Sequence, residues 1–155
     1  MGKAVMIRTA TEADLRKLTE LAQVYHSEHW FGEHTEFDAD YCFENFRGFH
    51  IGMVANIIVA EYNNEVIGFC IAVLVPLNWS PKVRCTIGYS YIAPEYRKTG
   101  VFGEMVQAQT DWAADKGAVD INLGDGAQYN GKFTSVCKGL GFTKTGTDSY
   151  KVLAH

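Results

Sequence analysis

The stretch that decides the fold joins a β-rich run to an amphipathic helix and reads Ile92-Ala93-Pro94-Glu95-Tyr96-Arg97-Lys98-Thr99-Gly100-Val101-Phe102-Gly103. Residues 84–92 favour a strand, and Pro94 ends it because proline has no N–H to give to a ladder. Apolar side chains recur at helical spacing over 101–116, and Gly117 stands where a C-terminal glycine cap is expected. The sequence therefore predicts a strand, a short break and a helix.

The break has the chemistry of an anion site. A helix N-terminus leaves about four backbone N–H groups unpaired and carries a partial positive charge. Gly100 and Gly103 permit close approach of the backbone, while Arg97 and Lys98 add full positive charges. These features predict a pyrophosphate cradle. The alternative is a basic, glycine-containing helix start that binds nothing.

Outward from this stretch, β-rich and helical patterns follow one another along the whole chain. Further strands are expected at 5–8, 57–62, 65–75, 119–123, 142–145 and 149–153. Further helices are expected from Thr11, over 38–46 and over 131–138. Asn63 and Asn64 suit a tight hairpin turn because asparagine tolerates a positive φ. This order predicts one domain, residues 1–155, of the α/β (α+β) class, with a mixed sheet and helices on both faces.

Length and charge restrict the class of protein. The 155 residues suit one core, and a net charge of −4 without a Lys/Arg cluster argues against a nucleic-acid binder. The N-terminus lacks the apolar region of a signal peptide. The longest apolar stretch, 66–77, is too short to span a bilayer, which needs roughly 20 residues. We therefore expect a cytoplasmic protein with no membrane partner and with its cysteines as reduced thiols.

Three segments together resemble the GNAT family of N-acetyltransferases. Residues 7–14 resemble that family's opening strand and helix start, and residues 92–100 resemble its central strand end and its (Q/R)-x-x-G-x-(G/A) loop. Residues 130–142 resemble its late helix and the Gly-Phe that starts the next strand. The resemblance implies a GNAT-like, mostly antiparallel sheet, with acetyl-CoA as co-substrate.

The resemblance also implies roles for residues of the quoted stretch. Ile92 and Ala93 match the splayed strand end whose backbone pairs with the pantetheine arm and polarises the thioester carbonyl. Asn130 matches the family's asparagine near the cofactor arm. The pyrophosphate loop is matched by Arg97, Lys98, Thr99, Gly100, Val101, Phe102 and Gly103.

Two residues depart from the family pattern. Phe102 stands where the family prefers Gly or Ala, which predicts looser or shifted binding of the pyrophosphate. Cys137 stands where many members have the tyrosine that protonates the departing CoA sulfur. A thiol, with an ordinary pKa of about 8.5, is an adequate proton donor for a thiolate, so Cys137 is the candidate acid; the alternative is that it fills a small core space.

Acceptor-side candidates lie in two places. Residues 26–34 carry three histidines and two glutamates, but a metal reading lacks an evident fourth ligand, so we expect no metal. In the resembled family this region lines the acceptor pocket, which makes His29 and Trp30 candidates. Tyr89 and Tyr91 alternate onto one face of the central strand, where they either pack or present a hydroxyl to the amine.

Asp125 follows the strand predicted to end at Leu123, beside the expected cleft. It is a candidate to position a cationic amine or to act as base through water, or it is simply a turn residue. No carboxylate occurs within 85–93, where some members of the resembled family keep a general base.

These expectations converge on direct transfer of an acetyl group from acetyl-CoA to an amine in a ternary complex. Strand-end amides would stabilise the oxyanion while CoA thiolate leaves. The alternatives are a non-catalytic acyl-CoA-binding module and a structural protein whose loop binds nothing. The acceptor stays open among polyamines, antibiotics, amino acids and protein termini, and so does a homodimer.

Overall fold

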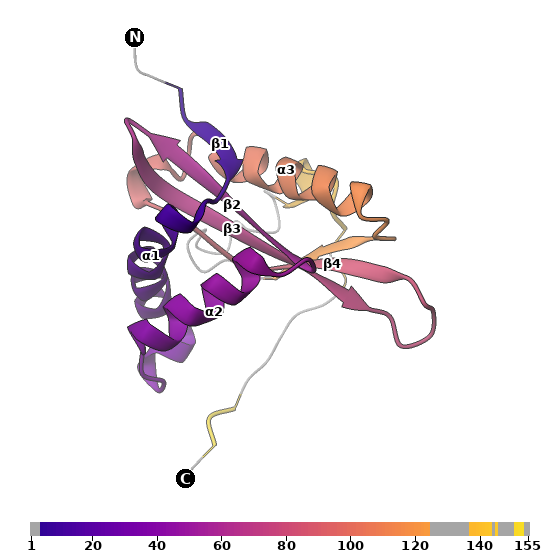
Figure 1. Cartoon of the computed structure of the whole chain (residues 1–155), viewed down its shortest axis with the longest axis horizontal. Coiled ribbons are helices and arrows are strands. Elements are labelled where there is room, and N and C mark those ends of the chain that lie inside the picture. The colour runs from indigo at the N-terminus through magenta and orange to yellow at the C-terminus, as the bar shows by residue number, and fades with distance from the viewer. Residues whose placement is uncertain (1–3, 125–136, 144, 146–150, 154–155) are drawn as a thin grey trace.

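One sheet organises the molecule, and within the described residues its strands run in chain order β1-β2-β3-β4-β5 (Figure 1). The computed structural model describes residues 4–124, 137–143, 145 and 151–153. The strands are β1 (Met6–Thr9), β2 (Ala55–Tyr62), β3 (Glu65–Pro76), β4 (Val83–Ile92) and β5 (Ile121–Leu123). The first four pair antiparallel, and β4 pairs with β5 in parallel. The expected mixed, mostly antiparallel sheet is confirmed.

Helices cover both faces of the sheet. The helices are α1 (Leu15–Glu28), α2 (Ala39–Ile51) and α3 (Val101–Asp115). Short 3-10 turns are η1 (Glu12–Asp14), η2 (Trp30–Glu33) and η3 (Pro94–Tyr96). Figure 1 shows α1 and α2 on one side of the sheet and α3 on the other. No helix in the described part of the chain is long and apolar enough to cross a membrane.

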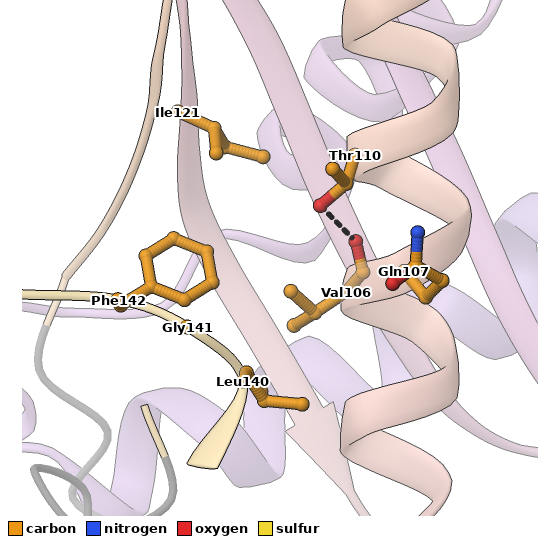
Figure 2. A pocket seen from close by; sticks show the side chains of 7 residues that line it. All are labelled: Val106, Gln107, Thr110, Ile121, Leu140, Gly141 and Phe142. Atoms are coloured by element: carbon orange, nitrogen blue, oxygen red, sulfur yellow. Dashed lines mark hydrogen bonds between the residues drawn. The ribbon is translucent and has the colours of Figure 1, made fainter. Parts of the chain in front are cut away.

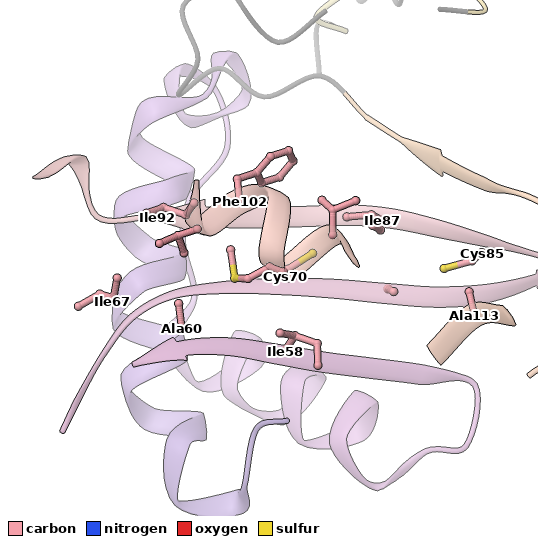
Figure 3. Packing of buried hydrophobic residues seen from close by; sticks show 13 residues of the cluster. Ile58, Ala60, Ile67, Cys70, Cys85, Ile87, Ile92, Phe102 and Ala113 are labelled. Carbon is pink, nitrogen blue, oxygen red and sulfur yellow. The ribbon is translucent and has the colours of Figure 1, made fainter. Parts of the chain in front are cut away.

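The core has two halves because the central strands are buried on both faces. Along β2, Ile57 and Val59 pack with α1 and α2, whereas Ile58 and Ala60 pack with α3. Figure 3 shows the α3 half, where β-strand side chains meet the start of the helix. Such double burial gives continuous apolar runs rather than alternation. It also fixes α3 against the sheet next to the end of β4.

A β-bulge at Gly88 changes the direction of the side chains in β4. Opposite strand β3, Ile71 pairs with Tyr89 and Ala72 pairs with Ile87, so Gly88 has no opposite residue. A one-residue insertion moves all later side chains to the opposite face. Ile87 therefore lies in the α3 half of the core, whereas Tyr91 lies in the α1–α2 half.

Most predicted elements are confirmed, with two differences. The Asn63-Asn64 turn has φ of 51° and 62°, as expected. The second helix continues to Ile51 and not to residue 46, because Phe49 still packs on the core. The closing strands are wrong where described: residues 142–143, 145 and 151–153 form no strand, since β propensity alone provides no ladder partner. Residues 131–136 of the predicted late helix lie outside the described residues.

Candidate functional site

The start of α3 is shaped by a left-handed glycine. Gly100 is the N-cap residue and has a φ of 82°, a conformation that L side chains rarely adopt. A Cβ at Gly100 would meet nothing within 4 Å, so the space in front of it is open. Thr99 closes the preceding turn, because its Oγ1 and its N–H both donate to Tyr96 O, at 2.6 and 3.3 Å.

Main-chain donors gather in this open space. Among the described residues, the N–H groups of Gly100, Val101 and Gly103 have no acceptor. The first bond inside the helix runs from Glu104 N–H to Gly100 O, at 3.2 Å. Lys98 is exposed and has no ion pair in the described structure. Unpaired amides, the helix dipole and a free ammonium group together favour an anion.

Arg97 is bound on the other side of the loop. Its Nε donates to Ile92 O at 2.7 Å, and its guanidinium donates to both carboxylate oxygens of Glu28 at 3.1 and 2.8 Å. The guanidinium also lies 5.3 Å from the centre of the Tyr91 ring. The side chain thus links the end of α1, the end of β4 and the predicted pyrophosphate loop, while Lys98 is the loop cation that stays unpaired.

Two loop residues, Phe102 and Gly103, are packed against other parts of the structure. Phe102 is 3% exposed and belongs to the core between α3 and the sheet. A Cβ at Gly103 would come 3.2 Å from Leu140 Cδ2, so the late segment packs closely on this part of α3. Burial in the core explains how a large residue fits at Phe102.

Strand β4 continues past its neighbour at the same end. Parallel pairing with β5 covers Cys85 to Ile87, and beyond it β4 has no described strand on that side. Ala93 N–H donates to Ile67 O at 2.8 Å, which places the backbone groups of Ala93 toward β3. Because groups alternate along an antiparallel strand, those of Ile92 point toward the β5 side.

Aromatic rings gather where the last turn of α1 meets β4. Tyr25 lies 3.9 Å from His29 and 5.9 Å from Tyr89, between ring centroids, and His29 stacks on Phe31 at 5.1 Å. Tyr89 and Trp30 are about half exposed, whereas Tyr91 is buried. Tyr89 and Tyr91 share one face because they are two residues apart on the strand, and the bulge at Gly88 turns that face toward α1.

The hydroxyl groups of this cluster are poor bases and poor acids. Burial raises the pKa of Tyr25 to about 12. Burial also raises the pKa of Tyr91, with the nearby Glu28 carboxylate adding to the effect and Arg97 opposing it. Both phenols therefore stay neutral near pH 7 and act as hydrogen-bond donors.

The histidines of residues 26–34 have local partners. His26 Nε2 lies 2.9 Å from Thr35 Oγ1, and His29 Nδ1 lies 2.9 Å from Tyr25 O. Within the described residues, no group of three or more His, Cys, Asp or Glu side chains could hold a metal ion.

Of the three candidate residues in the last part of the chain, the structure describes only Cys137. Asp125 and Asn130 lie outside the described residues. Cys137 is half-buried in a helical turn, and its carbonyl accepts from Leu140 N–H and Phe142 N–H, both at 3.0 Å. Leu140 in turn contacts Gly103, which links this turn to the start of α3.

A cavity of about 260 Å³ lies farther along α3 (Figure 2). It is lined by Val106, Gln107, Thr110, Ile121, Leu140, Gly141 and Phe142. Thr110 Oγ1 donates to Val106 O at 2.8 Å, the bond drawn in Figure 2, and Gln107 donates to Asp111 at 3.0 Å. None of the lining side chains is cationic, so this cavity lacks the charge that an anion requires.

Sequence reasoning missed three residues that shape the site. Tyr25 precedes His29 by four residues, and this spacing could have paired them on one helix face. An isolated glycine in a strand pattern, Gly88, is a known signal of a bulge. Nothing in the sequence points to Glu28 as the partner of Arg97.

Comparison with known proteins identifies the family of this chain. Residues 15–142 match the sequence model of the acetyltransferase (GNAT) family. No curated protein matches the chain significantly. Several solved structures share the fold.

A possible acetyltransferase from Clostridium difficile 630 is 17% identical over 99% of each chain, with a TM-score of 0.75. The aminoglycoside N-acetyltransferase AAC(6')-Iy, solved in complex with CoA, is 17% identical over 99% of this chain and 97% of its own, with a TM-score of 0.78. AAC(6')-Ih from Acinetobacter baumannii is 18% identical over 98% and 99%, with a TM-score of 0.72. These likenesses establish the expected fold, and the family match covers most of the sequence. The chain therefore belongs to the acetyltransferase (GNAT) family.

Proposed function

We propose that this protein transfers the acetyl group of acetyl-CoA to a primary amine by direct attack within a ternary complex. The observation that carries the proposal is the group of unpaired N–H donors at Gly100, Val101 and Gly103, beside the exposed Lys98. These N–H groups suit a pyrophosphate, because phosphate oxygens accept several short N–H bonds at a helix N-terminus. Members of this family are typically acetyl-CoA-dependent N-acetyltransferases.

The thioester would lie at the end of β4, where no described strand pairs with it on the β5 side. Beyond Ile87, no described strand pairs with β4 on its β5 side, next to the α3 amides, and Ile92 O at this strand end accepts from Arg97 Nε at 2.7 Å. A pantetheine arm leaving the pyrophosphate would run along this edge. An N–H there would hydrogen-bond the thioester oxygen and stabilise the oxyanion that forms during attack.

The acceptor would approach from the α1 side of β4. Tyr89 and Trp30 present partly exposed rings there, and Tyr91 lies beneath them. Aromatic faces attract ammonium groups. Aminoglycoside acetyltransferases share this fold, and one of them was solved in complex with sisomicin. Small-molecule amines are therefore the first acceptors to test.

We assign Cys137 as the proton donor to the departing CoA sulfur and Asp125 as a group that positions the amine. Cys137→Ala should lower kcat by about 10²-fold, the usual scale for general acid catalysis, without changing acetyl-CoA affinity. Cys137→Tyr should keep part of the rate. If Cys137→Ala lowers the melting temperature and leaves kcat unchanged, the thiol serves packing and is not the acid.

A CoA-release assay tests the proposal as a whole. The full chain is mixed with acetyl-CoA and, separately, spermidine, neamine or tyramine, while acetyl-CoA binding is followed by melting temperature. Ligand at 100 times its Kd should add about 2.7 kcal/mol to stability. Binding with CoA release supports transfer. Acetyl-CoA binding without CoA release for any amine would favour the second candidate function, a non-catalytic acyl-CoA-binding module. The observation behind this candidate is that Cys137 replaces the family's tyrosine.

A further inference from the structure

One polar atom in the acceptor-side cluster has no partner although it is buried. His29 is 8% exposed, and its Nε2 makes no hydrogen bond in the described structure. Its other nitrogen, Nδ1, is held 2.9 Å from Tyr25 O, four residues earlier on α1. Buried polar atoms are nearly always paired, so an orphan at this position points to a ligand group.

The partner of Nδ1 fixes the state of the ring. A backbone carbonyl can only accept, so Nδ1 must carry the hydrogen of the neutral imidazole. Nε2 therefore holds the lone pair. The contacting rings are those of Tyr25, at 3.9 Å, and Phe31, at 5.1 Å. Neither residue donates a hydrogen bond to Nε2. Because Nε2 can only accept in this tautomer, the missing partner is a hydrogen-bond donor.

The fold places this lone pair beside the end of β4. Glu28, the residue before His29, holds Arg97 at 2.8 Å, and Arg97 holds Ile92 O at 2.7 Å. Tyr25 meets Tyr89 of β4 edge to face, at 5.9 Å. The last turn of α1 thus lies against the strand end where the transfer proposed above would occur.

We propose that His29 Nε2 accepts a proton from the acceptor's ammonium group and is the general base of the transfer. This inference rests on the proposed function and names the substrate class, a protonated primary amine. One proton passes from the ammonium to Nε2, giving an imidazolium. The freed lone pair attacks the thioester carbon; the C–N bond forms and the C–S bond breaks. The departing sulfur takes the proton of the Cys137 thiol, and the amine's second proton restores that thiol. The imidazolium then releases its proton to water.

The turn η2 would have to shift for this contact. Nε2 is covered in the structure, with Phe31 of η2 stacked on the His29 ring. The turn is a single four-residue 3-10 segment. Its first 3-10 bond runs from Gly32 N–H to His29 O, at 3.0 Å. An ammonium group entering between the rings would replace Phe31 as the neighbour of Nε2, with Tyr25 and Tyr89 as aromatic walls.

The state of His29 can be read directly by imidazole ¹⁵N NMR on the full chain. Without ligand, we expect the Nδ1–H tautomer with an unprotonated Nε2. Acetyl-CoA alone should leave Nε2 unchanged, and millimolar spermidine, neamine or tyramine should move it toward the protonated position. A protonated Nε2 without ligand, or a resonance that none of the three amines moves, would overturn the inference.

Kinetics provide the second arm. His29→Ala should lower kcat/KM for the amine about 10²-fold with unchanged acetyl-CoA affinity. Added imidazole should restore part of the rate, whereas pyrrole, of similar size and with an N–H but no basic nitrogen, should not. His29→Phe keeps a ring for packing and should fold but stay inactive, and the matched control His26→Ala should stay active.

The two proposals fail in distinguishable ways. Full activity in His29→Ala or His29→Phe, with CoA release by the unaltered chain, removes His29 as base and leaves acetyl transfer in place. If the unaltered chain releases no CoA, transfer fails, and the ¹⁵N response to the amines still decides whether His29 receives their proton.

Discussion

At the start of α3 the candidate binding groups are main-chain N–H donors, whereas at the end of α1 the polar group is a buried side chain among aromatic rings. The first region depends on the conformation of one stretch, in which Gly100 has a φ of 82°. The second depends on residues of α1, η2 and β4 that meet only after folding. Arg97 and Glu28 join the two.

The difference teaches which half of a binding site depends on local chemistry. A helix start with glycines and cations favours an anion whatever surrounds it. A side chain such as His29 acquires its role from its surroundings, because a carbonyl at one nitrogen and rings at the other decide where the proton sits. The predictions that follow separate these two kinds of dependence.

Deleting Gly88 should have the largest effect on stability. Without the bulge, Tyr91 and Ile92 would exchange faces and lose their core positions. Burial of one large apolar side chain is worth about 1.5–3 kcal/mol, so the loss should be about 3–6 kcal/mol in urea unfolding. Gly88→Ala is the matched control, because its Cβ would meet nothing within 4 Å. An equal loss in both variants would show that the glycine itself, and not the bulge, is required.

Gly100→Val tests the region made of main-chain donors. A left-handed conformation costs a non-glycine residue about 1–2 kcal/mol, so acetyl-CoA should bind roughly tenfold more weakly. Gly100→Asn should bind nearly normally, since asparagine tolerates positive φ. Calorimetry with acetyl-CoA measures both. Unchanged affinity in Gly100→Val would mean that the amides of α3 do not hold the pyrophosphate.

How far the sequence predicts this molecule follows the same division. The strand–break–helix stretch, the Asn63-Asn64 turn and the sheet class follow from local chemistry and are confirmed. The pairing of Arg97 with Glu28, 69 residues away, is tertiary and has no local signal. The described residues of the predicted closing strands, 142–143, 145 and 151–153, form no strand, because a strand needs a neighbour as well as propensity.

Breaking the link between the two regions should have a moderate effect. The Arg97–Glu28 pair is partly exposed, with side-chain exposures of 17% and 29%. A double-mutant cycle with Arg97→Ala and Glu28→Ala should give a coupling of about 1 kcal/mol. Because Arg97 also holds Ile92 O, Arg97→Ala should raise KM for both substrates. Raised KM for acetyl-CoA alone would instead indicate direct contact of Arg97 with phosphate.

The start of α1, at Asp14, is far from the proposed site and serves as a control, with the smallest expected effect on acetyl-CoA binding. Hydrogen bonds from Arg8 lower the pKa of Asp14, and Thr11 N–H adds to this at 2.7 Å. A lowered pKa stabilises the fold above the unfolded value of about 3.9, and this stabilisation is lost as pH falls through the folded pKa. Asp14→Asn should therefore cost about 1 kcal/mol near neutral pH and flatten the acid limb of the stability profile. Acetyl-CoA affinity should not change; a change would connect this end of α1 to the site.

Backbone amide NMR during titration with acetyl-CoA tests the central claim most directly. If acetyl-CoA binds at the start of α3, the largest shifts fall on the N–H groups of Gly100, Val101 and Gly103, and Gly100→Val weakens them. Saturable binding whose shifts centre on Thr110 and Ile121 of the cavity along α3, or no shifts at millimolar acetyl-CoA, would contradict the account.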